Sequence, residues 1–191
     1  MLVEFPARVV VTSPSQDQSD EVLQEHVTKM FDAIGWPVPP VKTPGVRSIH
    51  LENGSSIEAL PGNERTNRGI SAVRLLIIDE AALVSDDLYT AMLPVIAVSR
   101  GRVIAGSTPF GKRGWFFDEF TKSHGPDWLK IRVKAEMCSR HTPEFLRAMR
   151  EQMGERRYRQ EMEASFEDMA DAVFSGEDID AAMVGDYETL F

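Results

Sequence analysis

The sequence has little cysteine, no long apolar run and no histidine pattern typical of a metal site. Its single cysteine, Cys138, excludes an internal disulfide and a cysteine-based metal site, and predicts a reducing, intracellular setting. The four histidines lack metal-ligand spacing, so we assign no metal role to them: His26, His50, His124 and His141. No apolar run approaches the ~20 residues that a membrane-crossing helix needs. Near the N-terminus, Glu4, Pro6 and Arg8 interrupt any secretory apolar segment.

Basic residues are absent from the last part of the chain. Residues 161–191 contain ten acidic side chains and no lysine or arginine, whereas residues 1–160 contain 21 basic and 20 acidic ones. The formal net charge of −9 therefore lies in the tail, which we interpret as a solvated helix plus a linker. The near-neutral body neither requires nor excludes nucleic acid. With 42% apolar residues, the 191-residue chain can build one domain, or one domain plus an appendage.

The sequence does contain a run of four large aliphatic residues, 75–78, that leads into two carboxylates, Asp79 and Glu80. Such a run predicts a strand buried on both faces of a parallel sheet, with the acids at its carboxyl edge. Open α/β sheets bind ligands at that edge. The layout is typical of the Walker B strand of a nucleotidase, where the first acid holds the Mg²⁺ shell and the second orients the attacking water. The alternative is that the acids only mark where the strand reaches solvent.

A second predicted strand, residues 101–105, is also expected to be buried and leads into Gly-Ser-Thr-Pro-Phe-Gly-Lys-Arg-Gly at 106–114. Lying beside the first strand, it could place a hydroxyl of Ser107 or Thr108 near the γ-phosphate or the attacking water. Between the two strands, Ser85 is expected to cap a helix that Pro94 ends or kinks.

The chain before these strands predicts a β–α unit and a hairpin. Residues 8–12 are β-branched and apolar, which predicts a strand. A helix should follow from Ser15 to about Ile34, with one apolar stripe: Val22, Leu23, Val27, Met30, Phe31 and Ile34. Asn-Gly between residues 47–51 and 56–60 predicts a hairpin. The polar loop 61–69 carries Arg65 and Arg68, which either approach phosphate or nucleic acid or are solvated.

The last third predicts helices and one strand. Aromatic residues from 115 to 120 begin an amphipathic helix and are read as core side chains rather than a base-stacking surface. Residues 128–133 alternate apolar and basic, which predicts a strand with one solvated face. Helices are expected at 143–152, 155–164 and 177–183. Arginines 156, 157 and 159 interleave with glutamates, which favours a salt-bridged surface over a DNA-binding patch.

This order of elements resembles the ATPase domain of the large subunit of tailed-phage terminases, over about residues 8–175. The resemblance rests on Leu-Leu-Ile-Ile-Asp-Glu-Ala-Ala at 75–82 and on the Ser-Thr-Pro-Phe-Gly stretch that begins 27 residues after Glu80. It implies an α/β, P-loop NTPase-like fold of the RecA/ASCE type, with a mostly parallel sheet flanked by helices. Residues 1–165 would be a partial ATPase domain. Residues 166–191 would be an acidic linker toward an absent nuclease domain.

The resemblance also implies roles for individual residues. Asp79 would be the Mg²⁺-associated acid of the nucleotide site, and Glu80 would be the catalytic base. Ser107 and Thr108 resemble the nucleotide-contacting motif that couples hydrolysis to movement. Arg68 matches the family's arginine that reaches a neighbouring subunit's nucleotide, with Arg65 as the second choice. A surface or DNA-facing position is open for Lys112 and Arg113.

As a member of that family the chain would be part of a motor that uses ATP and Mg²⁺ to move double-stranded DNA into a viral procapsid, in the cytoplasm of a bacterial host. Its partners would be DNA, a portal protein, the terminase small subunit and further copies in a ring. No Gly-x-x-x-x-Gly-Lys-Ser/Thr motif occurs in the sequence, so the P-loop strand and helix are expected to be missing and the chain alone inactive. The alternatives are a helicase-type nucleotidase fragment and a non-catalytic nucleic-acid-binding or assembly module.

Overall fold

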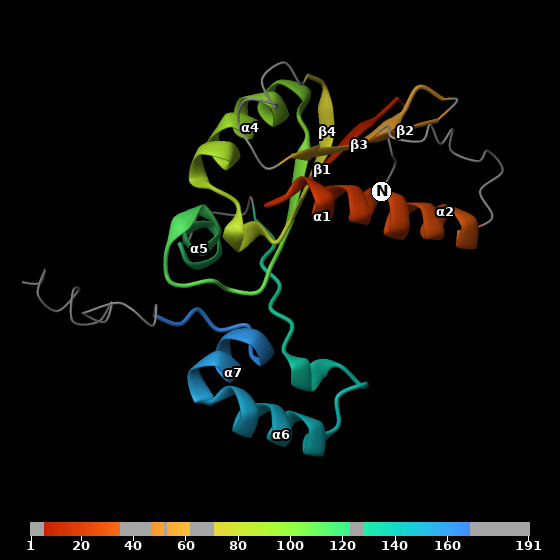
Figure 1. Ribbon diagram of the computed structural model, residues 1–191. Coiled ribbons are helices and arrows are strands. Elements are labelled where there is room, and N and C mark those ends of the chain that lie inside the picture. Colours follow the sequence, from red (N-terminus) through yellow and green to blue (C-terminus); the bar gives the residue numbers. More distant parts are fainter. Residues whose placement is uncertain (1–5, 35–46, 52, 62–70, 123–127, 169–191) are drawn as a thin grey trace, which may run out of the picture. The chain divides into compact units, whose positions relative to one another are not determined.

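The computed structural model describes residues 6–34, 47–51, 53–61, 71–122 and 128–168. The chain divides into two compact units, Met1–Ser107 and Thr108–Phe191. The first unit is built on a five-stranded sheet with the strand order β2-β3-β1-β4-β5 (Figure 1). Its strands are β1 (Arg8–Ser13), β2 (Ser48–His50), β3 (Ser56–Pro61), β4 (Val73–Asp79) and β5 (Arg102–Gly106).

Strand pairing confirms the predicted α/β class with a mostly parallel sheet. β1 pairs in parallel with β3 and β4, and β4 pairs in parallel with β5. Only β2, paired with β3, runs antiparallel, which is the hairpin predicted from Asn-Gly. Gly54 in that turn has a φ of 80°, a left-handed conformation that glycine adopts without strain.

Helices cover the two faces of this sheet. On one side lies α4 (Asp86–Ser99), which contacts β4 and buries Leu88 and Met92 (Figure 1). On the other side lies a continuous helical segment over β1 and β3, made of α1 (Gln16–Glu21), the π-helical η1 (Val22–Val27) and α2 (Thr28–Ile34). Leu23 joins Ile49 and Ala59 in a core cluster beneath it.

The predicted helix from Ser15 is confirmed, but its apolar stripe is only partly buried. Ser15 and Gln18 form a capping box at its start. Leu23 is buried, whereas Met30 is 66% exposed. The π-helical turn between them shifts the following residues around the helix axis, so Met30 does not continue the buried stripe.

Two expectations about the region from α4 to β5 are wrong. The helix does not end at Pro94 but continues to Ser99, because Pro94 lies on the exposed side where a lost backbone hydrogen bond can be met by water. β5 is a strand, as predicted, but it is not buried: it lies at the edge of the described sheet and Ile104 is 56% exposed.

A close backbone approach joins α4 to the start of β4 and β5. A Cβ built on Gly101 would lie 2.3 Å from the carbonyl oxygen of Val73. The Ser99 hydroxyl donates a hydrogen bond to the same carbonyl, and Arg74 Nη1 donates to the Ser99 carbonyl at 2.8 Å. Glycine at position 101 therefore permits the packing of two neighbouring parallel strands at their amino ends.

The second unit consists of α5 (Gly114–Thr121), the 3₁₀ turn η4 (Ala135–Met137), α6 (Pro143–Met153) and α7 (Glu155–Met162). The two predicted helices at 143–152 and 155–164 are confirmed within a residue or two. Trp115 is buried, as expected of a core side chain. The expected helix at 177–183 lies outside the described residues. No helix in the described ranges is long and apolar enough to cross a membrane.

The strand predicted at residues 128–133 does not form, and its apolar side chains are exposed. Leu129, Ile131 and Val133 are 84%, 67% and 59% exposed. Lys130 Nζ instead donates to the Lys122 carbonyl at 2.7 Å, and the Arg132 guanidinium lies 5.6 Å from the centre of the Phe120 ring. A strand needs a neighbouring strand to satisfy its backbone, and the described residues of this unit contain none.

Candidate functional site

The acids of the sequence motif lie at the carboxyl edge of the sheet. β4 ends at Asp79, which is aligned with Gly106 at the end of β5. On its other side Ile78 is aligned with Thr12 of β1, so Ser13 is the next neighbour of Asp79. A Cβ added at Gly106 would meet nothing within 4 Å. Space is therefore open beside Asp79 on the face that it shares with Gly106.

Glu80 adopts a left-handed backbone conformation, with φ 49° and ψ 44°. This conformation costs a residue other than glycine ~1–2 kcal/mol, and such strain is found mostly at functional sites. The chain then turns into η2 (Ala81–Leu83), where the Leu83 amide donates to the Glu80 carbonyl at 2.9 Å. The strained turn directs the second acid away from the strand, over the sheet edge.

The structure brings Glu80 and Ser107 together. Ser107 Oγ donates a hydrogen bond to Glu80 Oε2 at 3.4 Å, across the ends of β4 and β5. This distance is at the long end of the range for a hydroxyl donor, as is common in catalytic groups before a ligand is bound. Asp79, Glu80 and Ser107 thus belong to one edge of one unit, while Thr108 begins the second unit. Arg65 and Arg68 lie outside the described residues.

Two hydroxyls at the same edge are buried without a partner. Thr12 Oγ1 and Ser13 Oγ have no hydrogen-bond partner in the described part of the chain, although both side chains are at most 1% exposed. An unsatisfied buried hydroxyl costs ~1–3 kcal/mol. Because neighbouring strands lie about 4.8 Å apart and Ser13 follows the residue aligned with Ile78, its hydroxyl lies next to Asp79.

The oxygen-rich surroundings of Asp79 fit a magnesium ion that keeps most of its water. Among the described residues, no group of three or more His, Cys, Asp or Glu side chains could hold a metal. Mg²⁺ is usually held by one or two carboxylates together with waters and substrate phosphates rather than by a full protein cage. The orphaned Ser13 hydroxyl beside Asp79 is a suitable partner for such a water.

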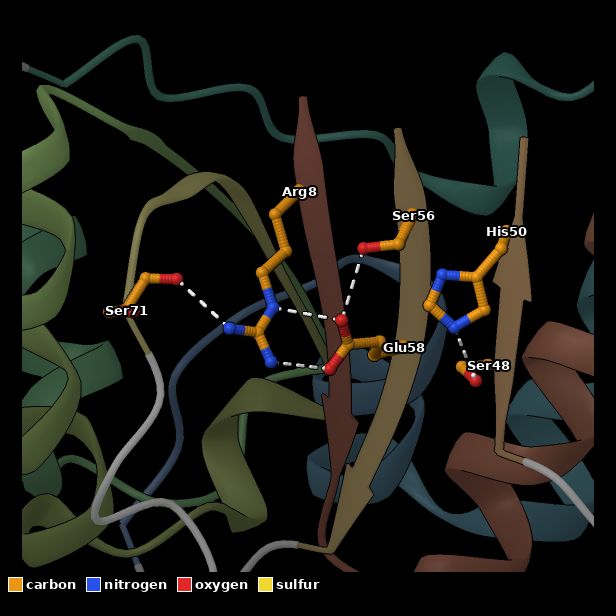
Figure 2. A network of polar contacts seen from close by, with 6 residues as sticks. All are labelled: Arg8, Ser48, His50, Ser56, Glu58 and Ser71. Atoms are coloured by element: carbon orange, nitrogen blue, oxygen red, sulfur yellow. Dashed lines mark hydrogen bonds and ion pairs between the residues drawn. The ribbon is translucent and has the colours of Figure 1, made fainter. Parts of the chain in front are cut away.

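The opposite, amino edge of the sheet carries an ionic network that the sequence did not reveal (Figure 2). Arg8 binds Glu58 with two hydrogen bonds, Nε to Oε1 at 2.8 Å and Nη2 to Oε2 at 2.6 Å. Arg8 Nη1 also donates to the Ser71 carbonyl at 3.0 Å, and Ser56 Oγ donates to Glu58 Oε1 at 3.0 Å. A charged residue in the middle of the predicted strand 56–60 was the only signal.

Burial tends to raise the pKa of Glu58, but the hydrogen bonds from Arg8 and Ser56 and the charge of Arg8 outweigh it and lower the pKa below its ordinary value. The network joins β1, β3 and the residues just before β4. It holds the strands together at the end of the sheet that lies away from Asp79.

Comparison with known proteins identifies the fold and the family. The family model for the terminase large subunit, T4likevirus-type, N-terminal, matches residues 2–181. The solved ATPase domain of the large terminase of Thermus phage P74-26 is similar, with 20% identity and a TM-score of 0.66, over 85% of this chain and 77% of that one. None of the curated proteins matches.

Two structures of the large terminase of another phage, a thermophilic bacteriophage, are also similar. The complex with ADP has 11% identity and a TM-score of 0.69, over 84% of this chain. The complex with ATP-gamma-S has 12% identity and a TM-score of 0.65, also over 84% of this chain. In both cases the match spans 40% of the longer phage protein.

Proposed function

Because the chain belongs to the family of terminase large-subunit N-terminal domains, we propose that it supplies the acid-bearing part of an ATPase that drives DNA packaging. The observation that carries the proposal is the carboxyl edge, where Asp79, the strained Glu80 and the Ser107 hydroxyl gather at the ends of two adjacent parallel strands. That edge is where open α/β sheets bind ligands.

Glu80 is the general base of this proposal. Ser107 donates to Oε2, which leaves Oε1 to accept a proton from a water that attacks the γ-phosphate. The left-handed backbone at Glu80 fixes the direction in which the carboxylate leaves the strand. Ser107 keeps the carboxylate oriented, and its hydroxyl can respond when phosphate arrives or leaves.

Asp79 is the residue that holds the magnesium ion of Mg-ATP through its carboxylate, with Ser13 donating to a water of the ion's shell. The ion would neutralise charge on the β- and γ-phosphates. The loop that holds these phosphates is not encoded in this sequence, because the Gly-x-x-x-x-Gly-Lys-Ser/Thr pattern is absent from it. In the proposed motor a P-loop, double-stranded DNA, the portal protein and the small subunit complete the machine.

The test uses a form of the protein that includes a P-loop and hydrolyses ATP. Glu80→Gln should lower turnover by ~10²–10⁴-fold while nucleotide binding persists, because a positioned base contributes about that much. Asp79→Asn should instead weaken binding of Mg-ATP. Asp87→Asn, an exposed acid in the first turn of α4, is the matched control and should change neither. Near-normal turnover in Glu80→Gln would place the base elsewhere, and would favour a non-catalytic module if wild type were also inactive.

Arg68 is proposed to act on the nucleotide of a neighbouring subunit. In the sequence it comes three residues before Ser71, whose carbonyl is held by Arg8 at the amino edge. The seven residues of β4, at ~3.3 Å each, put roughly 20 Å between that edge and Asp79. A side chain that starts at the amino edge is therefore poorly placed to serve its own carboxyl edge, whereas a neighbour's site imposes no such distance.

Mixing two inactive chains tests this assignment. In a mixed ring, an Arg68→Ala subunit keeps Glu80, and an adjacent Glu80→Gln subunit can supply Arg68. A trans-acting arginine predicts partial recovery of ATP hydrolysis in mixtures, since such a residue can contribute ~10³–10⁵ in rate. Absence of recovery at every ratio, with ring assembly confirmed, would reject the trans role. Arg65→Ala provides the comparison for the second candidate.

A further inference from the structure

The chain that leaves α7 is fastened to the second unit along residues 163–168, here called the exit segment. At its start, Ala164 has a φ of 50°, and the Ser165 amide donates to the Arg159 carbonyl at 3.0 Å, so the chain turns back on the helix. A plain linker would leave these residues in solvent. Here all six are partly buried.

An aromatic socket receives the middle of the exit segment. The Phe166 ring lies 5.1 Å from the Phe117 ring, 5.7 Å from Phe120 and 6.1 Å from Phe116, measured between ring centres. All three belong to α5, which begins just after the stretch 106–114. Edge-on and tilted contacts at such distances contribute beyond simple burial of the rings.

Ionic contacts hold both ends of the exit segment. Arg150 Nη2 binds Glu163 Oε1 at 2.7 Å, and Arg159 Nη2 binds Glu167 Oε2 at 2.7 Å. The Glu167 side chain is only 13% exposed. The basic residues of α6 and α7 are therefore engaged by acids of their own unit, as the interleaved charges suggested, rather than presented to DNA.

Lys112 supplies the contact from the stretch that follows Ser107 and Thr108. Its Nζ binds Asp168 Oδ2 at 3.0 Å, a contact between residues 56 positions apart. Arg156 Nη1 donates to the carbonyl of the same Asp168 at 2.8 Å. Asp168 is thus held by side chain and backbone at once, from two different parts of the unit.

We propose that Lys112 and Asp168 are positioning residues that fasten the exit segment to the stretch following Ser107–Thr108. The single covalent link between the two units is the peptide between Ser107 and Thr108. Ser107 contacts Glu80 at the first unit's sheet edge, and Lys112 follows five residues later. Any displacement of that stretch reaches the exit segment directly through Lys112 and, through α5, by way of Phe166.

A single exposed ion pair contributes little to stability, and each partner here is about 35% exposed. The pair gains its effect from the socket, because Phe166 already confines the segment and reduces the conformational entropy that the ion pair must overcome. The proposed role in transmitting hydrolysis rests on the proposed ATPase function; the fastening itself does not.

Amide hydrogen exchange on the 191-residue chain tests the fastening, with the Ser165 amide as reporter. Lys112→Glu should speed exchange in residues 165–168 by about threefold, and the charge swap Lys112→Glu with Asp168→Lys should restore protection. Phe166→Ala should speed it by ~10-fold. Lys122→Glu is the matched control, because it breaks only the exposed Lys122–Asp118 pair on α5. Unchanged exchange in Lys112→Glu and Phe166→Ala, or no restoration in the swap, would overturn the proposal.

A second measurement separates positioning from stability. In the ATP-hydrolysing form, Lys112→Glu should leave ATP turnover within about twofold of wild type and lower the DNA moved per ATP by several-fold, with recovery in the charge swap. Equal DNA movement per ATP in all three proteins would overturn the transmitting role. Failure of the ATPase proposal would appear instead as absent turnover in wild type, while the exchange result would still stand.

Discussion

The two edges of the parallel sheet differ in how completely their polar groups are satisfied. At the amino edge, Arg8, Glu58, Ser56 and the Ser71 carbonyl form a closed network in which each charge meets its opposite (Figure 2). At the carboxyl edge, the Ser13 and Thr12 hydroxyls lack partners in the described residues. Glu80 is strained there, and its contact with Ser107 is long.

The difference separates stabilisation from function. A network with every group paired contributes to folding and leaves nothing for a ligand to gain. Unpaired hydroxyls and a strained acid cost folding free energy, and a ligand that satisfies them recovers part of that cost on binding. The same strands therefore carry a stabilising end and a reactive end, and substitutions at the two ends should have opposite effects on stability.

The largest effect on stability is expected at the amino edge. Arg8→Ala removes both hydrogen bonds to Glu58 and the one to Ser71, which should lower the free energy of unfolding by ~2 kcal/mol, allowing for the partial exposure of the pair. Urea unfolding measures the change. Lys29→Ala, which breaks an exposed pair with Glu25, is the control and should have little effect. Equal effects of the two variants would remove the contrast between the edges.

The contribution of Arg8 should also depend on pH. The pKa of Glu58 is lowered in the folded protein, so its ionised form stabilises the fold above the ordinary value of 4.5. This stability is lost as the pH falls from that value through the lower, folded-state pKa. The difference in unfolding free energy between wild type and Arg8→Ala should therefore shrink in acid, and a constant difference from about pH 7 to about pH 3 would contradict the assignment.

At the carboxyl edge the sign should reverse. Glu80→Gly relieves the left-handed backbone strain and should raise the free energy of unfolding by ~1 kcal/mol. Glu80→Gln keeps the strain and should bring no such gain. Thermal unfolding of the two variants beside wild type measures this, and a Glu80→Gly protein less stable than Glu80→Gln would show that the turn is not strained.

The smallest effect should come from the paired serines. Ser13→Ala removes an unpartnered buried hydroxyl and should be neutral or stabilising by ~0.5 kcal/mol. Ser56→Ala removes a hydroxyl that donates to Glu58 and should be destabilising by a similar amount. Both serines are buried and both lie on strands, so they form a matched pair across the two edges. The same sign for both would break the comparison.

The strands that carry the site could be predicted from the sequence because their signals are local. Four aliphatic residues before Asp79 predict β4, and Asn-Gly predicts the hairpin, with no knowledge of the neighbours. The Ser85 cap likewise depends on Leu88, three residues away. These signals were sufficient to anticipate a mostly parallel sheet.

The features that the sequence could not supply depend on distant partners. Glu58 meets Arg8 across 50 positions, and the segment at 128–133 finds no strand beside it in the described part of its unit. Pro94 is tolerated because of where α4 faces solvent. The left-handed backbone at Glu80 arises where β4 ends and the chain turns sharply into η2, and no local pattern of residue types announces it.

Gly101 has a consequence for how the sequence can vary. Every other amino acid carries a Cβ, and at this position that atom would lie 2.3 Å from a backbone oxygen that cannot move aside without shifting β4. Any single-base change that alters the amino acid at this codon thus introduces the clash. In a population of functional variants, position 101 should remain glycine even though it contacts no ligand, because it sets the spacing of the two strands that bring Glu80 and Ser107 together.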